Sequence, residues 1–162
     1  MSHHCLVSKV EELEHINGLP VPQLLLDLIS QNRWRHPGDD ILRRLVPGLY
    51  EPVCDPVEFL PFDRMELESR SHMHDRETMN CFKERAGSVE VVPALPWIDI
   101  EKRFFIAVCA VPGADVGIAL DYRPSAETPC VVALCYSGDP NGEFYWVHVA
   151  DSFDEFVRDC RL

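Results

Sequence analysis

Cysteine and histidine are the residues of this chain best suited to covalent chemistry. The seven cysteines, at positions 5, 54, 81, 109, 130, 135 and 160, are odd in number and scattered, which is not typical of a disulfide framework. Cys130 and Cys135 lie in one apolar run, and their odd spacing places them on opposite faces of a strand. We therefore expect core packing, since a CxxC redox pair is more closely spaced. Cys109 and His148 would form a nucleophile and a base only if the fold brings them together.

Two short patterns match parts of metal sites. The tetrapeptide HMHD at 72–75 has two histidines that do not share a helix face, and no third ligand at a recognisable spacing. The loop GDPNGE at 138–143 matches the start of a calcium loop, but the twelfth position is Ala150, where such a loop needs Glu. Because Asn-Gly is a hairpin-turn signal, a turn explains this loop better. We expect neither a metal site nor a cofactor.

The sequence lacks the local motifs of common enzyme classes. It has no GxSxG, no phosphate-binding loop, no dinucleotide fingerprint and no HExxH. We therefore expect a protein that is not an enzyme, with a small enzyme built on an unrecognised Cys/His site as the remaining alternative.

The chain is strongly acidic, with a formal net charge of −12. From Phe105 to Leu162 there are nine acidic and three basic residues. This charge argues against nucleic acid as a partner, because binding phosphates requires a basic patch. It argues equally against an anionic membrane surface. An acidic surface attracts a basic protein and speeds its association, although a simple role in solubility explains the same charge.

Length and composition indicate a single globular domain spanning residues 1–162. The apolar fraction of 46% is too high for a disordered chain. No apolar run approaches the length of a membrane span, and the N-terminus lacks the pattern of a signal peptide. We therefore expect a cytoplasmic location.

The first half of the chain has mainly helical patterns. Leu24, Leu25, Leu28 and Ile29 form an apolar stripe after Pro22, which suits a first helical turn. Helices are expected over 7–16, ended by Asn-Gly, within 19–35, and after a cap at Asp39 or Asp40. After a cap at Asp63, residues 63–86 predict one broken helix or two short ones. Three prolines predict an extended surface loop at 51–61.

The second half of the chain has strand patterns. Runs rich in Val, Ile, Phe, Tyr and Trp occur at 103–110, 115–122, 130–136 and 143–149, with a weaker run at 88–92. Short links between successive runs predict antiparallel hairpins. The expected fold class is α+β, with N-terminal helices, then a mainly antiparallel sheet of four to six strands packed against helices, and a closing C-terminal helix.

The chain ends in a strand that leads directly into a helix, in the sequence WVHVADSFDEFVRDCRL. Ser152 and Glu155 have the spacing of a capping box, in which each side chain accepts from the other residue's backbone N–H. Phe153, Phe156 and Val157 then share one helix face, which we expect to pack on the sheet.

Two of the three tryptophans, Trp34 and Trp97, are candidate anchors for a partner, since Trp is enriched at interface hot spots. Trp146 lies in a predicted strand, where we expect core packing. Trp34 follows the first long helix, and Trp97 lies in PALPWID before the sheet. For both, core packing and a role in partner binding are the alternatives.

Several of these features together resemble the SUKH superfamily, which includes the Smi/Knr cell-wall regulators of yeast and many bacterial immunity proteins. They are Leu19-Pro20 before the first long helix, a strand ending at Leu120-Asp121, an apolar pair at Val131-Val132, and the terminal A-x-SF-x-x-F pattern at 150–156. The resemblance spans residues 19–162. It implies one SUKH-like domain that binds a protein and has no catalytic activity.

Bacterial members of this superfamily resemble antidotes that bind and block a secreted toxin, often a nuclease with a basic groove. The resemblance thus implies an immunity protein whose carboxylates occupy the place of phosphates on a basic toxin domain. The candidate partner-binding residues are Trp97, Asp99, Glu101, Asp115, Asp139 and Glu143. Asp121 is as readily structural, holding the turn at Tyr122-Arg123. A regulatory module of the same fold with a cellular partner is the alternative function.

Overall fold

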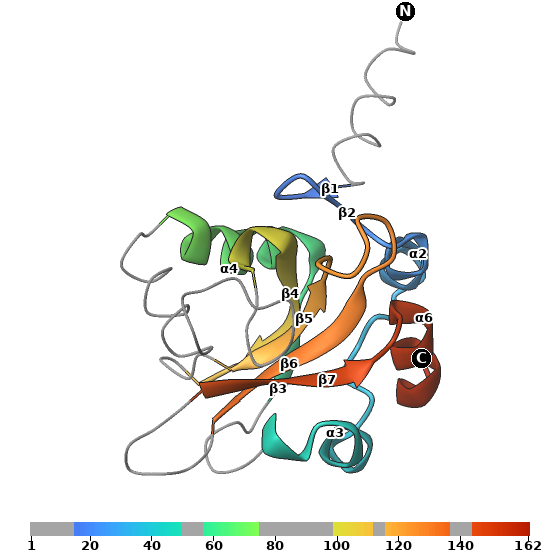
Figure 1. Ribbon diagram of the computed structural model, residues 1–162. Helices are drawn as coiled ribbons and strands as arrows, with labels where there is room; N and C mark the ends of the chain where they lie inside the picture. Colours follow the sequence, from blue (N-terminus) through green and yellow to red (C-terminus); the bar gives the residue numbers. More distant parts are fainter. Residues whose placement is uncertain (1–14, 50–56, 75–98, 112–115, 137–143) are drawn as a thin grey trace, which may run out of the picture.

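A five-stranded antiparallel sheet forms the centre of the protein (Figure 1). The computed structural model describes residues 15–49, 57–74, 99–111, 116–136 and 144–162, without the side chains of 71–74, 136 and 144. Helices pack on the sheet, and the last of them closes the chain. The α+β class is therefore confirmed. Among the described residues, no helix is long and apolar enough to cross a membrane.

The strands lie in the order β3 (Val57–Phe59), β4 (Arg103–Cys109), β5 (Gly117–Asp121), β6 (Cys130–Tyr136) and β7 (Phe144–Ala150). All neighbouring pairs are antiparallel, and the prediction of β4 to β7 is confirmed. The prediction of an extended surface loop was wrong at Val57–Phe59, which pair with β4. Prolines at 56 and 61 flank this strand, where they remove no hydrogen bond from its middle, and β3 lies at the sheet edge. The weak run at 88–92 lies outside the described residues.

The helices are α2 (Gln23–Ser30), α3 (Asp39–Leu45), α4 (Phe62–His74) and α6 (Phe153–Cys160), with short 3-10 turns η1 (Pro47–Leu49) and η2 (Ile100–Lys102). In Figure 1, α4 and α3 lie on opposite sides of the sheet, and α2 lies above α6 at one end. Two predicted caps were wrong. Asp39 and Asp63 lie within the first turns of α3 and α4, and Gly38 occupies the N-cap of α3.

A small hairpin precedes α2. Its strands β1 (His15–Ile16) and β2 (Leu19–Pro20) pair across Asn17 and Gly18, whose φ angles are 52° and 78°. The prediction of a helix reaching residue 16 was therefore wrong at its end, and its residues 7–14 lie outside the described part. Two successive positive φ angles suit Asn-Gly in a two-residue hairpin turn, and this local preference ends any helical pattern. The Tyr122 hydroxyl donates to the Pro20 carbonyl and ties the hairpin to the sheet.

Beside the part of β4 that β3 does not reach, α4 accepts a hydrogen bond that a neighbouring strand would otherwise accept. β3 ends at Phe59, and a bulge follows in the β4–β5 ladder between Phe105 and Ala107. Beyond the end of β3, the Phe105 N–H donates to the Ser69 hydroxyl of α4 at 3.0 Å. Ser69 is buried, so this bond satisfies a backbone donor that water cannot reach.

Both faces of the sheet are buried. On one face Phe105 stacks on Trp146 at 6.4 Å, and the Arg103 guanidinium lies 4.3 Å above the Phe105 ring centre. The strand register places Cys130 on this face and Cys135 on the other, and both are buried, as predicted. These contacts make the sheet a core layer on both sides and explain its nearly continuous apolar strands.

Of the two hydrogen bonds of the capping box predicted for α6, the one to the Ser152 hydroxyl is confirmed. The Ser152 hydroxyl accepts from the Glu155 N–H at 3.1 Å. The reciprocal bond differs from the prediction, because Glu155 accepts from the N–H of Asp151, one residue earlier, at 2.8 Å. Phe153, Phe156 and Val157 are buried, as their spacing predicted.

Replacing Ser152 by Ala should lower the free energy of unfolding by about 1 kcal/mol, because the Glu155 N–H loses its acceptor. Urea denaturation measures this change. The variant Ser152→Asp retains an acceptor and should recover most of the loss. Equal destabilisation by both substitutions would show that the cap contributes nothing.

Candidate protein-binding surface

Two of the six predicted partner-binding residues lie in the described part of the protein, Glu101 within η2 and Asp99 just before it. Asp99 is the N-cap of η2, and its carboxylate accepts from the Glu101 N–H at 3.0 Å. Asp99 is half-buried and Glu101 is exposed. Trp97, Asp115, Asp139 and Glu143 lie outside the described residues, so their assignment stays a prediction.

η2 contacts α4, which sequence analysis did not link to it (Figure 1). We call the described side chains of β3, α4, η2 and its N-cap Asp99 the α4–η2 surface. It contains six acidic and three basic side chains: Glu58, Asp63, Glu66, Glu68, Asp99 and Glu101, with Arg64, Arg70 and Lys102. The excess of carboxylates gives this part of the fold a negative field.

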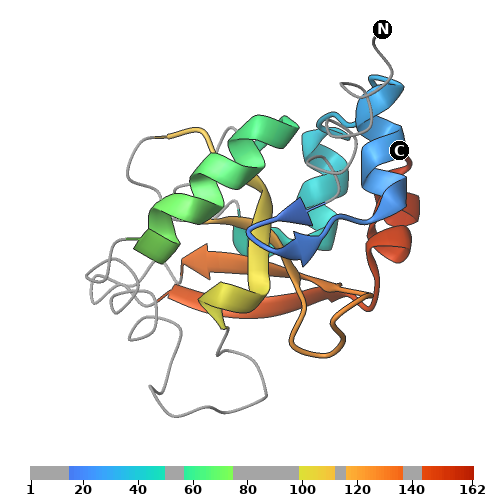
Figure 2. The same ribbon diagram turned by 90° about the horizontal axis from the view of Figure 1, so that it is seen from above.

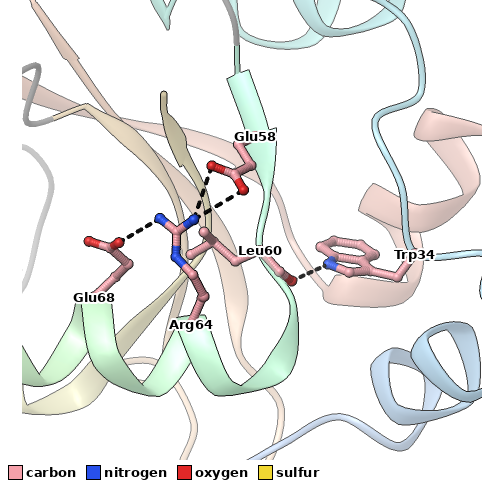
Figure 3. Close-up of polar contacts among 5 residues, drawn as sticks. All are labelled: Trp34, Glu58, Leu60, Arg64 and Glu68. Atoms are coloured by element: carbon pink, nitrogen blue, oxygen red, sulfur yellow. Dashed lines mark hydrogen bonds and ion pairs between the residues drawn. The ribbon is translucent and has the colours of Figure 1, made fainter. Parts of the chain in front are cut away.

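Arg64 organises one group of carboxylates on this surface (Figure 3). Its Nη1 lies 3.1 Å from Glu58 Oε1, and its Nη2 lies 2.8 Å from Glu68 Oε1. The hydrogen bond to Glu68 and the charges of both carboxylates raise the pKa of Arg64. Arg70 pairs in the same way with Glu66 one turn earlier. The Arg64–Glu58 pair joins α4 to β3, whereas the pairs with Glu68 and Glu66 lie within α4. The surface keeps a net negative charge.

Two exposed carboxylates, those of Asp63 and Glu101, have no cationic partner among the described residues. Leu67 lies one helical turn after Asp63, and 64% of it is exposed, the highest exposure of any large apolar side chain described. A single exposed leucine is common on a monomer. Together with uncompensated carboxylates on the same surface, however, it supplies the apolar and charged side chains that protein contacts combine.

Three of the four described thiols are not suited to nucleophilic chemistry. Burial raises the pKa of Cys130 to about 11, with Asp121 adding to the effect, and raises the pKa of Cys135 and Cys160 to about 12. Such thiols stay protonated at neutral pH, whereas a nucleophilic thiol needs a lowered pKa. Their burial among apolar side chains assigns these cysteines to packing.

The fold does not bring Cys109 and His148 together. Cys109 ends β4, His148 lies in β7, and β5 and β6 run between them. Three strand spacings separate the two strands, on the order of 14 Å. The two residues therefore do not form a nucleophile–base pair. Within the described ranges, no group of three His, Cys, Asp or Glu side chains is placed to bind a metal.

Asp121 and Trp34 have structural roles. The buried Asp121 carboxylate accepts from the Arg123 backbone N–H at 3.0 Å and from its Nη2 at 2.7 Å, so it holds the following turn as expected. Trp34 Nε1 donates to the Leu60 carbonyl at 3.0 Å (Figure 3). The Trp34 ring also packs on Phe59. Of the two alternatives for Trp34, core packing is the one observed.

Comparison with known proteins identified no relative. No protein-family model matches the chain, and no curated protein or solved structure matches it significantly.

Proposed function

We propose that this protein is a non-catalytic binding domain of the immunity type, which neutralises a toxin by binding its basic domain. The observation that supports this most is the α4–η2 surface, where the carboxylates of Asp63 and Glu101 accompany the exposed Leu67. The sequence resemblance to SUKH immunity proteins, carried largely by the β7–α6 ending, points to the same function.

The expected mechanism is occlusion. Carboxylates on the α4–η2 surface pair with the Lys or Arg side chains that would bind phosphates in a nuclease groove, and Leu67 is buried at the contact. The excess negative charge accelerates association, so the association rate constant should fall as salt screens the charges. Arg64 keeps Glu58 and Glu68 in fixed positions, which reduces the conformational entropy lost on binding.

Co-expression with the toxic product of the neighbouring gene tests this function. The wild-type protein should restore growth, and the double variant Asp63→Lys/Glu101→Lys should fail to do so. With purified proteins at low salt, the double variant should associate at least tenfold more slowly, because like charges now face each other at the contact.

The matched control is Asp40→Lys/Glu127→Lys. Asp40, like Asp63, is exposed in the first turn of a helix, and Glu127, like Glu101, is exposed. Each reversal adds two positive charges, so both double variants carry a net charge of −8. We expect the control to protect nearly as well as the wild type. Equal loss in both variants would remove the α4–η2 surface from the contact, and a toxin that remains toxic beside the wild-type chain would contradict the function itself.

A further inference from the structure

β7 forms the edge of the sheet opposite to β3. In Figures 1 and 2, β6 lies between β7 and α4. No strand in the described part of the chain pairs with its outer side. Its sequence, FYWVHVA, contains no Asp, Glu, Lys, Arg or Pro. Exposed edge strands usually carry such residues, which prevent pairing with other chains. The bulge where β6 pairs with the end of β7 lies beyond His148 and leaves residues 144–148 regular.

The hydrogen-bonding direction along β7 follows from the ladder. The N–H of Phe105 points away from β5 and toward α4, so its partner Ala119 directs its backbone groups to β6. Alternation through the next two ladders assigns the backbone groups of Val147 to β6. Trp146 and His148, the neighbours of Val147, therefore direct their N–H and C=O groups to the outer side of the sheet.

We propose that β7 pairs antiparallel with β7 of a second copy of this chain, forming a two-fold homodimer with one continuous sheet. A register centred on Trp146 uses only the regular residues and brings outward-facing backbone groups opposite each other. It also places Tyr145 opposite Val147 of the second copy, an aromatic–β-branched pair of the kind that stabilises sheets. Both side chains are half-buried, so the pairing completes their burial.

A second copy fits this edge better than the basic partner proposed above. The strand carries no carboxylate, and the described acid nearest to it in sequence, Asp151, is bound by His148 at 2.8 Å. Two identical neutral strands can pair through backbone hydrogen bonds and apolar side-chain contacts, without opposite charges. The two chains repel through their net charges, so added salt should strengthen the dimer, whereas it should weaken binding of a basic protein.

Sedimentation equilibrium of the wild-type chain over a wide concentration range tests the dimer. We expect the average mass to rise with protein concentration toward twice 18.5 kDa. Added salt should shift this rise to lower protein concentrations. His148→Pro removes an outward N–H without touching the β6–β7 ladder, and should raise the dimer dissociation constant about thirtyfold, since two symmetry-related donors are lost. His148→Ala, which keeps the N–H, should leave the constant within a few fold.

Hydrogen exchange provides a readout that needs no variant. The amides of Trp146 and His148 should be protected at high protein concentration and exchange freely on dilution. A chain that stays monomeric at all concentrations would overturn the proposal. Protection that does not depend on concentration would also overturn it, because the chain itself would then cover the edge. Protection that appears only with a basic partner would assign the edge to that partner instead.

Discussion

Replacing Asp121 by Ala should lower the free energy of unfolding by about 3–5 kcal/mol, and the melting temperature by about 10 °C. The Asp121 carboxylate is 2% exposed and accepts a backbone N–H and both Nε and Nη2 of Arg123. Without it, Arg123, whose side chain is only 14% exposed, keeps its charge in a largely buried site with no carboxylate from Asp121. Differential scanning calorimetry and urea denaturation measure the loss.

A double-mutant cycle isolates the ion pair from the loss of packing. Arg123→Ala alone should also destabilise, but the double variant Asp121→Ala/Arg123→Ala should lose less than the two single losses added together. Glu127→Ala, an exposed change in the same connection between strands, should stay within about 0.5 kcal/mol of the wild type. If Asp121→Ala resembles Glu127→Ala, the carboxylate does not hold this turn.

The strands of the sheet were predictable because each is a short apolar run between turn residues. The bounds of Cys130–Tyr136 agree fully with the prediction, because branched and aromatic residues fill the strand and turns flank it. The strand at Val57–Phe59 was not predicted, because the local sequence, with prolines at 56 and 61, favours a loop. Only its pairing with β4, about fifty residues later, makes it a strand.

The candidate surface was less accessible to sequence reasoning. Charge near the sheet predicts Asp99 and Glu101 as binding residues, whereas the sequence predicts Asp63 only as a helix cap. It predicts no role for Leu67. Its exposure follows from the side on which α4 packs, which is set by contacts such as that of Ser69 with Phe105, 36 residues apart. An apolar residue between Glu66 and Glu68 was the one available signal, and it does not distinguish core from surface.

Replacing Phe153 by Ala should lower the free energy of unfolding by about 3–5 kcal/mol, through lost burial and the cavity that remains. Phe153 is 2% exposed, and its ring lies 5.8 Å from that of Trp34 and 6.4 Å from that of Phe156. Trp34 in turn donates to the Leu60 carbonyl just before α4. The ring thus joins α6 to the junction of β3 and α4, which supports the candidate surface. Urea denaturation measures the loss.

Leu67→Ala is the informative counterpart of this variant. Leu67 is exposed, so its replacement should leave stability within about 0.5 kcal/mol. It should nevertheless weaken binding of the proposed toxin partner, because a hot-spot side chain at a contact is costly to remove. Phe153→Ala should show the opposite pattern, with lower stability and near-normal affinity where the variant remains folded. If Leu67→Ala lost as much stability as Phe153→Ala, Leu67 would belong to the core and the α4–η2 surface would lose its apolar centre.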